Sequence, residues 1–312
     1  MNTPSIKPSR LLPWLQLMRL PNVFTAMADV AMGFLFTHES LWPPGTFVLL
    51  LVASSALYSA GMVINDVFDV EQDRRQRPDR PIPSGRIQLQ QAIPLGFLFI
   101  VVGEASCAFA ALATRDWLPL ILAPILAIVI LRYNSRWKRT PLGPVAMGGC
   151  RFLNVLLGMS VSPQPLGAAN YLVAAGIGVY IVGLTWFARR EATTSPRNHL
   201  LGGFITMLAG LALLWLFPKF SSAPSLADIW NLHPQYWALL WLALAALIGW
   251  RFVRAITNPQ PALVQAAVKT GILSIIVLDA AVVLGVRGCV PALGVLALLI
   301  PAILLGRWVY ST

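Results

Sequence analysis

The sequence predicts an all-α fold: a polytopic membrane bundle of about nine or ten transmembrane helices, in a single domain over residues 1–312. Two observations lead to this prediction. The chain is 57% hydrophobic and only 11% charged, with a mean hydropathy of +0.71. Apolar runs of about 18 residues or more, the length that crosses a bilayer, recur along the whole chain. We therefore expect an integral, multi-pass membrane protein rather than a globular domain with an anchor.

The apolar runs define the expected membrane spans in chain order. They are Asn22–Thr37, Phe47–Ile64, Ala92–Ala113, Leu118–Leu131, Leu142–Val161, Ala168–Ala188, Leu200–Phe217, Tyr236–Val253, Val264–Val286 and Cys289–Trp308. Only Arg287 and Gly288 separate the last two runs, so these form either a hairpin or one long kinked segment. The predicted number of helices is therefore nine or ten.

The positive charge of the chain falls mainly between the apolar runs. The net charge is +11, but this placement indicates membrane topology rather than a nucleic-acid-binding surface. With the N-terminus in the cytoplasm, eighteen lysines and arginines lie in inside loops and three, Arg115, Lys219 and Arg287, in outside loops. We therefore expect the loops after the second, fourth and sixth spans on the cytoplasmic face, in a bacterial inner membrane, surrounded by membrane lipid.

A cluster of acidic residues follows the second span. Asp66, Asp69 and Asp73 are spaced i, i+3 and i+7, so on a helix their carboxylates share one face, with Asn65 beside them. Like charges on one face repel each other, and oxygen ligands of this kind suit Mg²⁺. We predict that the three aspartates bind Mg²⁺ and form the catalytic centre. A solvated acidic loop neutralised by neighbouring arginines would show the same pattern.

Basic residues cluster in the three loops that are expected on the same face as the acidic motif. Mg²⁺ together with lysine and arginine can hold a diphosphate. The same cations stabilise the negative charge that develops as the C–O bond of the diphosphate ester breaks. An apolar bundle could also enclose an isoprenoid tail. The charged residues thus favour chemistry on a diphosphate, and the bundle supplies the apolar tunnel that the tail needs if the group on it is an isoprenoid.

Two segments carry a resemblance to a known family. Asn65-Asp66-x-x-Asp69-x-x-x-Asp73 and the following Arg-Pro-Asp-Arg-Pro-Ile-Pro-Ser-Gly run resemble the first aspartate-rich motif of the UbiA superfamily of intramembrane prenyltransferases. The segment from Tyr133 to Thr140 resembles its second conserved loop. The resemblance implies about nine helices, a Mg²⁺-bound prenyl diphosphate and transfer to an aromatic or other lipid acceptor. It also implies that Lys138 contacts the diphosphate.

The second acidic motif of the superfamily, an Asp-x-x-x-Asp after the sixth span, is altered in this chain. Ala188 and Ala192 stand at the aligned positions, and Glu191 alone offers a carboxylate, which we predict as a further metal ligand. The run Thr-Trp-Phe-Ala-Arg-Arg-Glu-Ala resembles the EboC-like branch of the superfamily. Arg189 and Arg190 either contact the diphosphate in place of a second ion or act only as positive-inside residues.

Two polar residues within the fifth span are further candidates. Arg151 and Asn154 are three residues apart on one helix face. An arginine inside a membrane is costly and marks a functional site by default, but it could instead be a structural partner of Asp29, Glu104 or Asp279. The predicted substrate-binding residues are Asn65, Arg77, Tyr133, Lys138, Arg139, Arg151, Asn154, Arg189 and Arg190.

The leading hypothesis is a membrane-embedded, Mg²⁺-dependent prenyltransferase that moves an isoprenoid group from a prenyl diphosphate to an aromatic or lipid acceptor. The alternative is a non-catalytic lipid or metabolite binding or transport component on the same fold. The altered second motif is the observation that supports the alternative, because Ala188 cannot bind a metal ion.

Overall fold

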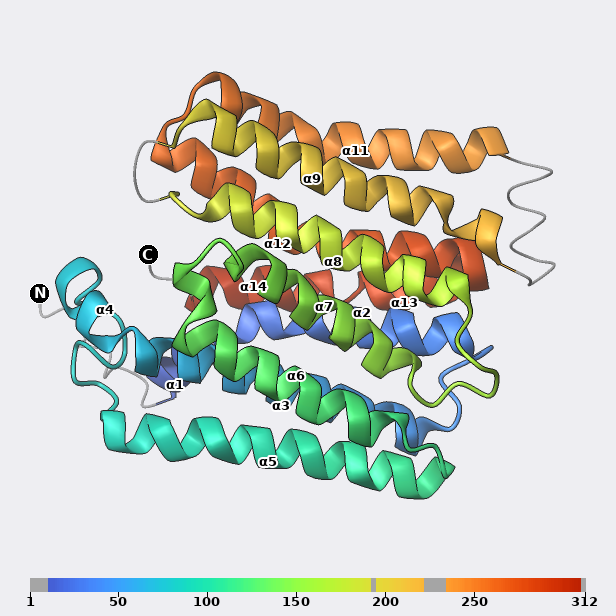
Figure 1. Cartoon of the computed structure of the whole chain (residues 1–312), viewed down its shortest axis with the longest axis horizontal. Coiled ribbons are helices and arrows are strands. Elements are labelled where there is room, and N and C mark those ends of the chain that lie inside the picture. Colours follow the sequence, from blue (N-terminus) through green and yellow to red (C-terminus); the bar gives the residue numbers. More distant parts are fainter. Residues whose placement is uncertain (1–10, 192–194, 222–233, 310–312) are drawn as a thin grey trace, which may run out of the picture.

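The computed structural model describes residues 11–191, 195–221 and 234–309, and over these ranges the regular structure is helical (Figure 1). This confirms the predicted all-α fold. The helices are α1 (Leu12–Leu17), α2 (Leu20–Thr37), α3 (Pro44–Phe68), α4 (Val70–Gln76), α5 (Leu89–Thr114), α6 (Leu118–Ser135), η1 (Trp137–Arg139), α7 (Gly143–Met159), α8 (Ala168–Ala188), α9 (Arg197–Leu216), η2 (Phe217–Phe220), α11 (Pro234–Thr257), α12 (Pro261–Arg287), α13 (Cys289–Leu296) and α14 (Leu299–Val309).

Within the described ranges, nine helices are long and apolar enough to cross a membrane. The helix α7 has 17 residues, one fewer than the shortest of these nine. The last of the nine, Cys289–Val309, is interrupted between α13 and α14. Gly288 turns the chain back after α12 with a φ of +80°, a left-handed value that glycine adopts without a side-chain clash. The last two predicted spans therefore form a hairpin.

The helices form an inner set and an outer set. In α2 and α12, 67% of the most apolar stretch is buried, against 33% in α5 and 28% in α11. The outer helices expose large apolar side chains, such as Phe97 and Phe109 on α5 and Leu247 and Trp250 on α11. An apolar outer surface of this kind is compatible with lipid and not with water.

Two glycines allow α2 and α7 to touch backbone to backbone. A Cβ atom on Gly33 would lie 2.6 Å from the carbonyl oxygen of Val155, and one on Gly158 would lie 2.6 Å from that of Val30. Small residues permit such close packing of membrane helices. The contact places one polar face of α2 directly against α7, which is where Arg151 lies.

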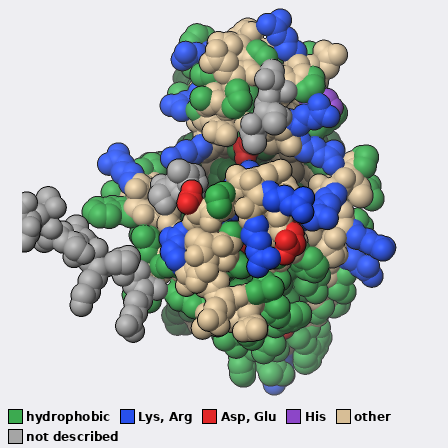
Figure 2. Space-filling model, turned by 90° about the vertical axis from the view of Figure 1, so that its left-hand side faces the viewer, with side chains coloured by type: hydrophobic (Ala, Val, Ile, Leu, Met, Phe, Trp, Pro, Cys, Tyr) green, Lys and Arg blue, Asp and Glu red, His purple; other side chains and the backbone are tan. Residues whose placement is uncertain are grey.

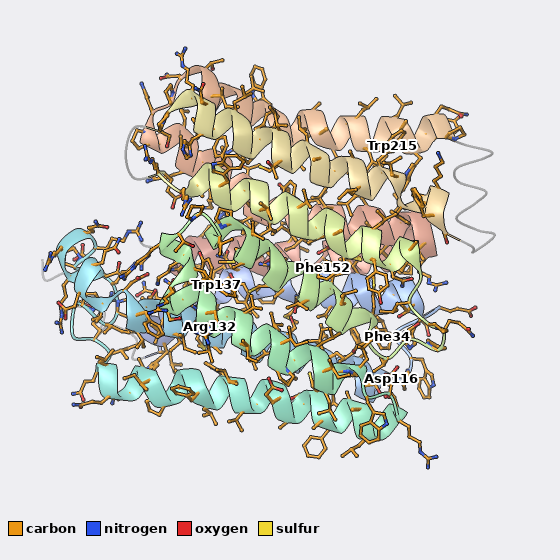
Figure 3. All side chains as sticks on the ribbon, in the orientation of Figure 1. Phe34, Asp116, Arg132, Trp137, Phe152 and Trp215 are labelled. Atoms are coloured by element: carbon orange, nitrogen blue, oxygen red, sulfur yellow. The ribbon has the colours of Figure 1, made fainter. Side chains whose placement is uncertain are left out.

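Three segments lie at one end of the bundle, which we call the motif end: α4, η1 and residues 189–191 (Figure 1). Figure 2 faces this end and shows lysine and arginine side chains spread across it. Figure 3 shows Arg132 and Trp137 at the motif end of α6 and Asp116 at the opposite end. The structure therefore brings the three predicted loops to one face, as the charge pattern requires.

The charge asymmetry predicts that the motif end is cytoplasmic. Cysteine replacing Arg75 or Arg136, both exposed at the motif end, should react with a membrane-impermeant thiol reagent only from the cytoplasmic side. Cysteine replacing Gln164, exposed between α7 and α8, should react only from the other side. The measurement uses vesicles of known orientation and a chain whose three native cysteines are replaced. Reaction of R75C and R136C from opposite sides would contradict the bundle itself.

Candidate functional site

The acidic motif lies at a kink between α3 and α4. Asp69 leaves helical geometry at φ −96° and ψ 4°, although its N–H still bonds to the carbonyl of Asn65 at 3.0 Å. The N–H of Asp73 bonds in turn to the carbonyl of Asp69 at 2.8 Å. Asp66 and Asp73 are 5% and 3% exposed. Asp66 and Asp73 are thus buried rather than part of a solvated loop. Asp69 is partly exposed, and the kink turns it toward a different partner from the other two.

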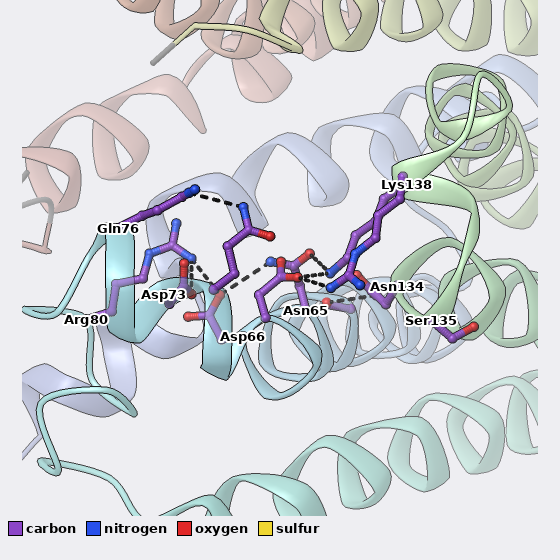
Figure 4. Close-up of polar contacts among 12 residues, drawn as sticks. Asn65, Asp66, Asp73, Gln76, Arg80, Asn134, Ser135 and Lys138 are labelled. Atoms are coloured by element: carbon purple, nitrogen blue, oxygen red, sulfur yellow. Dashed lines mark hydrogen bonds and ion pairs between the residues drawn. The ribbon is translucent and has the colours of Figure 1, made fainter. Parts of the chain in front are cut away.

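Asp66 and Asp73 converge on one atom, the Nη1 of Arg80 (Figure 4). This nitrogen lies 3.3 Å from Oδ1 of Asp66 and 2.7 Å from Oδ2 of Asp73. Arg19 adds a third contact, since its Nη2 lies 3.3 Å from the same Oδ1. Sequence reasoning did not place Arg80 in the site. Its only signal was its position in the proline-rich run after the acidic motif, where the chain folds back.

Lys138 binds the third aspartate. Its Nζ lies 2.7 Å from Oδ1 of Asp69 and 3.2 Å from Oδ1 of Asn65, while Nη2 of Arg139 lies 3.6 Å from the same aspartate oxygen. The Lys138 side chain is only 11% exposed, against 64% for Arg139. Burial lowers the pKa of Lys138, and Asp69 opposes that shift. The structure therefore places Lys138 against the first motif, and its contact with a diphosphate, which the resemblance implied, stays a prediction.

The end of α8 meets the same group of loops. Nη2 of Arg189 donates a hydrogen bond to the carbonyl of Thr140, directly after η1. Burial raises the pKa of Glu191, and the positive charges of Arg77 and Arg19 partly offset that rise. Glu191 thus lies within electrostatic reach of the first motif loop. Ala188 ends α8, and Ala192 lies outside the described residues.

The first motif offers carboxylate oxygens that are suitable ligands for a magnesium ion. In the described part of the chain, no three Asp, Glu, His or Cys side chains come together as a ready-made metal site. Two carboxylates nevertheless share one cationic nitrogen, so their oxygens already converge on a single positive charge. Carboxylate oxygens are hard ligands of the kind that Mg²⁺ prefers. Asp66 and Asp73 fit the ion if Arg80 moves aside.

A mostly apolar cavity begins directly below the acidic motif. Leu57, Met62, Ile130 and Met147 contribute to its walls, and Tyr133 lines it on the side of α6. The cavity lies between α2, α3, α6 and α7. It therefore extends from Tyr133 and Asn134, near the motif end of α6, to polar residues of α7 inside the bundle.

Arg151 and Asn154 line the same cavity from α7. Nη1 of Arg151 donates to Oδ2 of Asp29 at 2.8 Å, and Nη2 donates to the hydroxyl of Thr25 at 2.7 Å. Nδ2 of Asn154 also donates to Oδ2 of Asp29, at 2.9 Å. Of the three acidic partners considered from the sequence, Asp29 is the one that forms the ion pair. Arg151 is therefore both a structural partner and a cavity-lining residue.

Comparison with known proteins decides the family. A model described as the UbiA prenyltransferase family matches residues 26–268. The chain belongs to this family. The predicted superfamily is confirmed, whereas the EboC-like branch stays a prediction. Membership also agrees with an integral, multi-pass membrane protein.

Several curated relatives share one name. Digeranylgeranylglyceryl phosphate synthase of Methanoculleus marisnigri is 38% identical over 135 residues, which cover 43% of this chain and 46% of that protein. The enzyme of the same name from Methanothrix thermoacetophila is 33% identical over 165 residues, which cover 52% and 59%. The matched segment thus spans less than two thirds of either relative. Both organisms are archaea, so the predicted bacterial inner membrane remains a prediction.

Solved structures show the same fold. A structure of digeranylgeranylglyceryl phosphate synthase superimposes with a TM-score of 0.63 at 20% identity, over 90% of this chain and 99% of that one. A UbiA homologue from Archaeoglobus fulgidus bound to geranyl diphosphate and Mg²⁺ gives a TM-score of 0.58 at 16% identity, over 84% and 99%. At these identities the likeness concerns the fold.

Lys138→Ala should weaken diphosphate binding much more than Arg136→Ala. A charge-assisted phosphate contact contributes about 1.5–3 kcal/mol, which corresponds to a loss of affinity of roughly tenfold to a hundredfold. Arg136 is exposed beside η1 and serves as the matched control. Calorimetric titration with geranyl diphosphate measures both. Equal, negligible losses of affinity in the two variants would show that this loop only determines membrane topology.

The lowered pKa of Lys138 predicts a pH dependence. Because burial favours the neutral amine, the side chain loses its charge at a lower pH than a free lysine does. Diphosphate affinity should therefore fall as the pH rises through that lowered pKa. Lys138→Arg, whose guanidinium stays charged, should move the fall to higher pH. An identical alkaline profile for both proteins would show that Lys138 does not carry the binding.

Proposed function

We propose that the protein is a Mg²⁺-dependent prenyltransferase that moves an isoprenoid group from a prenyl diphosphate to an aromatic or lipid acceptor. One observation carries the proposal: Arg19, Arg80 and Lys138, from three segments of the chain, contact the three aspartates of the first motif. These six residues form what we call the mouth, next to the apolar cavity. The mouth suits a diphosphate and the cavity suits an apolar group. Membership of the UbiA family and the names of the curated relatives support the same activity.

The charged mouth binds the diphosphate in this proposal. Asp66, Asp69 and Asp73 would hold Mg²⁺, which would supply positive charge to neutralise the phosphate groups. Lys138 releases Asp69 and donates to phosphate oxygens, as Arg80 does when it leaves its two carboxylates. Tyr133 lines the cavity below this point, where an aromatic face can stabilise an allylic cation.

The transfer itself breaks one bond and forms another. The bond between C1 of the prenyl group and the diphosphate oxygen breaks, and its electron pair leaves with the diphosphate. Fixed cations at the mouth stabilise that charge as it develops. An electron pair of the acceptor forms the new bond to C1. The proton that the acceptor loses passes to the departing diphosphate.

The altered second motif suggests that the two motifs compensate the negative charge of the diphosphate in different ways. Glu191 is the one carboxylate left in that motif, and burial raises its pKa. Arg189 already contacts the second loop. We propose that Arg189 or Arg190 contacts the diphosphate and replaces a second ion with fixed positive charge. In the competing interpretation both arginines only determine topology.

A non-catalytic lipid or metabolite binder on the same fold is the second candidate, because Ala188 removes one ligand of the second motif. Radiolabelled geranyl diphosphate and a membrane lipid extract separate the two functions. The transferase converts the label into a lipid-extractable product with Mg²⁺ and not with EDTA. Metal-dependent binding of the label without any product would establish the binder instead.

Substitutions in the two motifs should have unequal effects. Asp69→Asn should abolish the Mg²⁺-dependent part of geranyl diphosphate binding, whereas Glu191→Gln should change affinity much less. Replacing Arg189 and Arg190 together by alanine should weaken binding even at saturating Mg²⁺, because fixed charge is lost there. Calorimetry with geranyl diphosphate and Mg²⁺ measures all three. Two strongly coupled Mg²⁺ ions per ligand, or intact affinity without both arginines, would contradict the single-ion proposal.

A further inference from the structure

We propose that the outward face of α5 that carries Glu104 binds the same face of a second copy of this chain, and that the carboxyl groups of the two Glu104 residues meet in the interface. The helix α5 lies along the outer edge of the bundle and packs against α3 and α6 (Figure 1). Glu104 does not line the cavity below the acidic motif. The inference therefore goes beyond the proposed function and does not depend on it.

Glu104 is an ionisable residue deep inside the membrane. Its position in α5 places it about 22 Å from the motif end of the helix and about 15 Å from the other end. A glutamate side chain is too short to bring its carboxyl group to either membrane surface from this depth. Ionisable residues at such a depth nearly always face other protein groups or a cavity, and they mark functional sites by default.

The surroundings of Glu104 differ from those of two other acids deep in the spans. Asp29 and Asp279 are fully buried between helices. Glu104 is partly exposed, at the edge of the face that α5 turns away from the bundle. Its Oε1 atom is enclosed by protein but has no hydrogen-bond partner among the described residues. An unpartnered carboxyl group in hydrocarbon is costly, so we infer that a group from another molecule satisfies it.

The residues on either side of Glu104 follow the spacing of a helix–helix seam. Phe97, Val101, Glu104 and Ala108 are separated by four, three and four residues, the alternation found in left-handed coiled coils and in most pairs of membrane helices. Phe97 and Val101 are 55% and 63% exposed. Ala108 is small enough to let a second helix come close. A single polar residue in such a seam sets the register of the two helices.

A second copy of the chain is the partner that this face fits. Copies in one membrane share one orientation, so a two-fold axis along the membrane normal brings each seam residue opposite itself at the same depth. A neutral carboxyl group both donates and accepts a hydrogen bond, so two Glu104 groups can pair with each other. The neutral form is also the one that hydrocarbon favours. A different protein would need a polar group of its own at this depth.

Cysteine crosslinking tests whether this face meets itself. The chain with its three native cysteines replaced carries one new cysteine, at Ala108 in the seam or at Phe109. Phe109 is 62% exposed at nearly the same depth but lies about 100° further round α5. In isolated membranes treated with copper phenanthroline, we expect A108C to form a disulfide-linked dimer several-fold faster than F109C. Equal rates, or faster crosslinking of F109C, would overturn the interface.

Substitutions of Glu104 assign the association to its carboxyl group. Glu104→Gln keeps a donor and an acceptor at the same place, whereas Glu104→Leu has neither. Glu104→Leu should weaken association roughly threefold to thirtyfold, the range that hydrogen bonds between membrane helices contribute, and Glu104→Gln should keep most of it. Single-molecule photobleaching of purified, labelled protein in lipid vesicles at several protein-to-lipid ratios measures the dimer fraction. Single bleaching steps for the unmodified chain at every ratio, or unchanged association of Glu104→Leu, would overturn the proposal.

Two controls separate the interface from a loss of folding and from the lipid-facing surface in general. Glu104→Leu should not lower the unfolding temperature of the monomer in dilute detergent, because the carboxyl group has no described partner within the chain. Leu247→Ala, at a side chain 73% exposed on the outer helix α11, should leave the dimer fraction unchanged. A lower unfolding temperature for Glu104→Leu, or an equal loss of dimer in Leu247→Ala, would overturn the assignment to Glu104.

Discussion

The pairing of three aspartates with basic side chains determines the arrangement of the motif end. Asp66 and Asp73 are almost fully buried, and a buried carboxylate is costly unless a cation is beside it. The cations come from different segments: Arg19 precedes α2, Arg80 follows α4 and Lys138 lies in η1. The acidic motif therefore organises loops that are distant in sequence. A diphosphate with Mg²⁺ can replace these pairs, because it brings both signs of charge to the same place.

A second ion pair plays the corresponding role inside the membrane. Arg151 and Asp29 face each other because Gly33 and Gly158 let α7 approach α2 to backbone contact. Bulkier residues at these two glycines would separate the helices and leave both charges without a partner. The small residues are thus part of the site, although they contact no ligand. The cavity gains a polar end only through this close packing.

Hydropathy predicted most of the fold, and the differences have physical causes. The run Ala168–Ala188 coincides with α8, whereas the run Leu118–Leu131 ends before α6 does, because hydropathy marks apolar residues and the helix continues to the polar Ser135. The i, i+3, i+7 spacing predicted three aspartates on one face of a helix. It could not show that the helix is kinked at Asp69. Arg80 was missed because only tertiary folding of the proline-rich run brings it back.

The distribution of charge along the cavity determines the orientation of a substrate that has a charged head and an apolar group. At the mouth, lysines and arginines outnumber the buried aspartates that they contact, so an anion is favoured there. Twelve ångströms deeper, by about eight residues of helical rise, one arginine is balanced by acidic groups and no anion is favoured. A substrate with a charged head and an apolar group therefore has one orientation, head at the mouth.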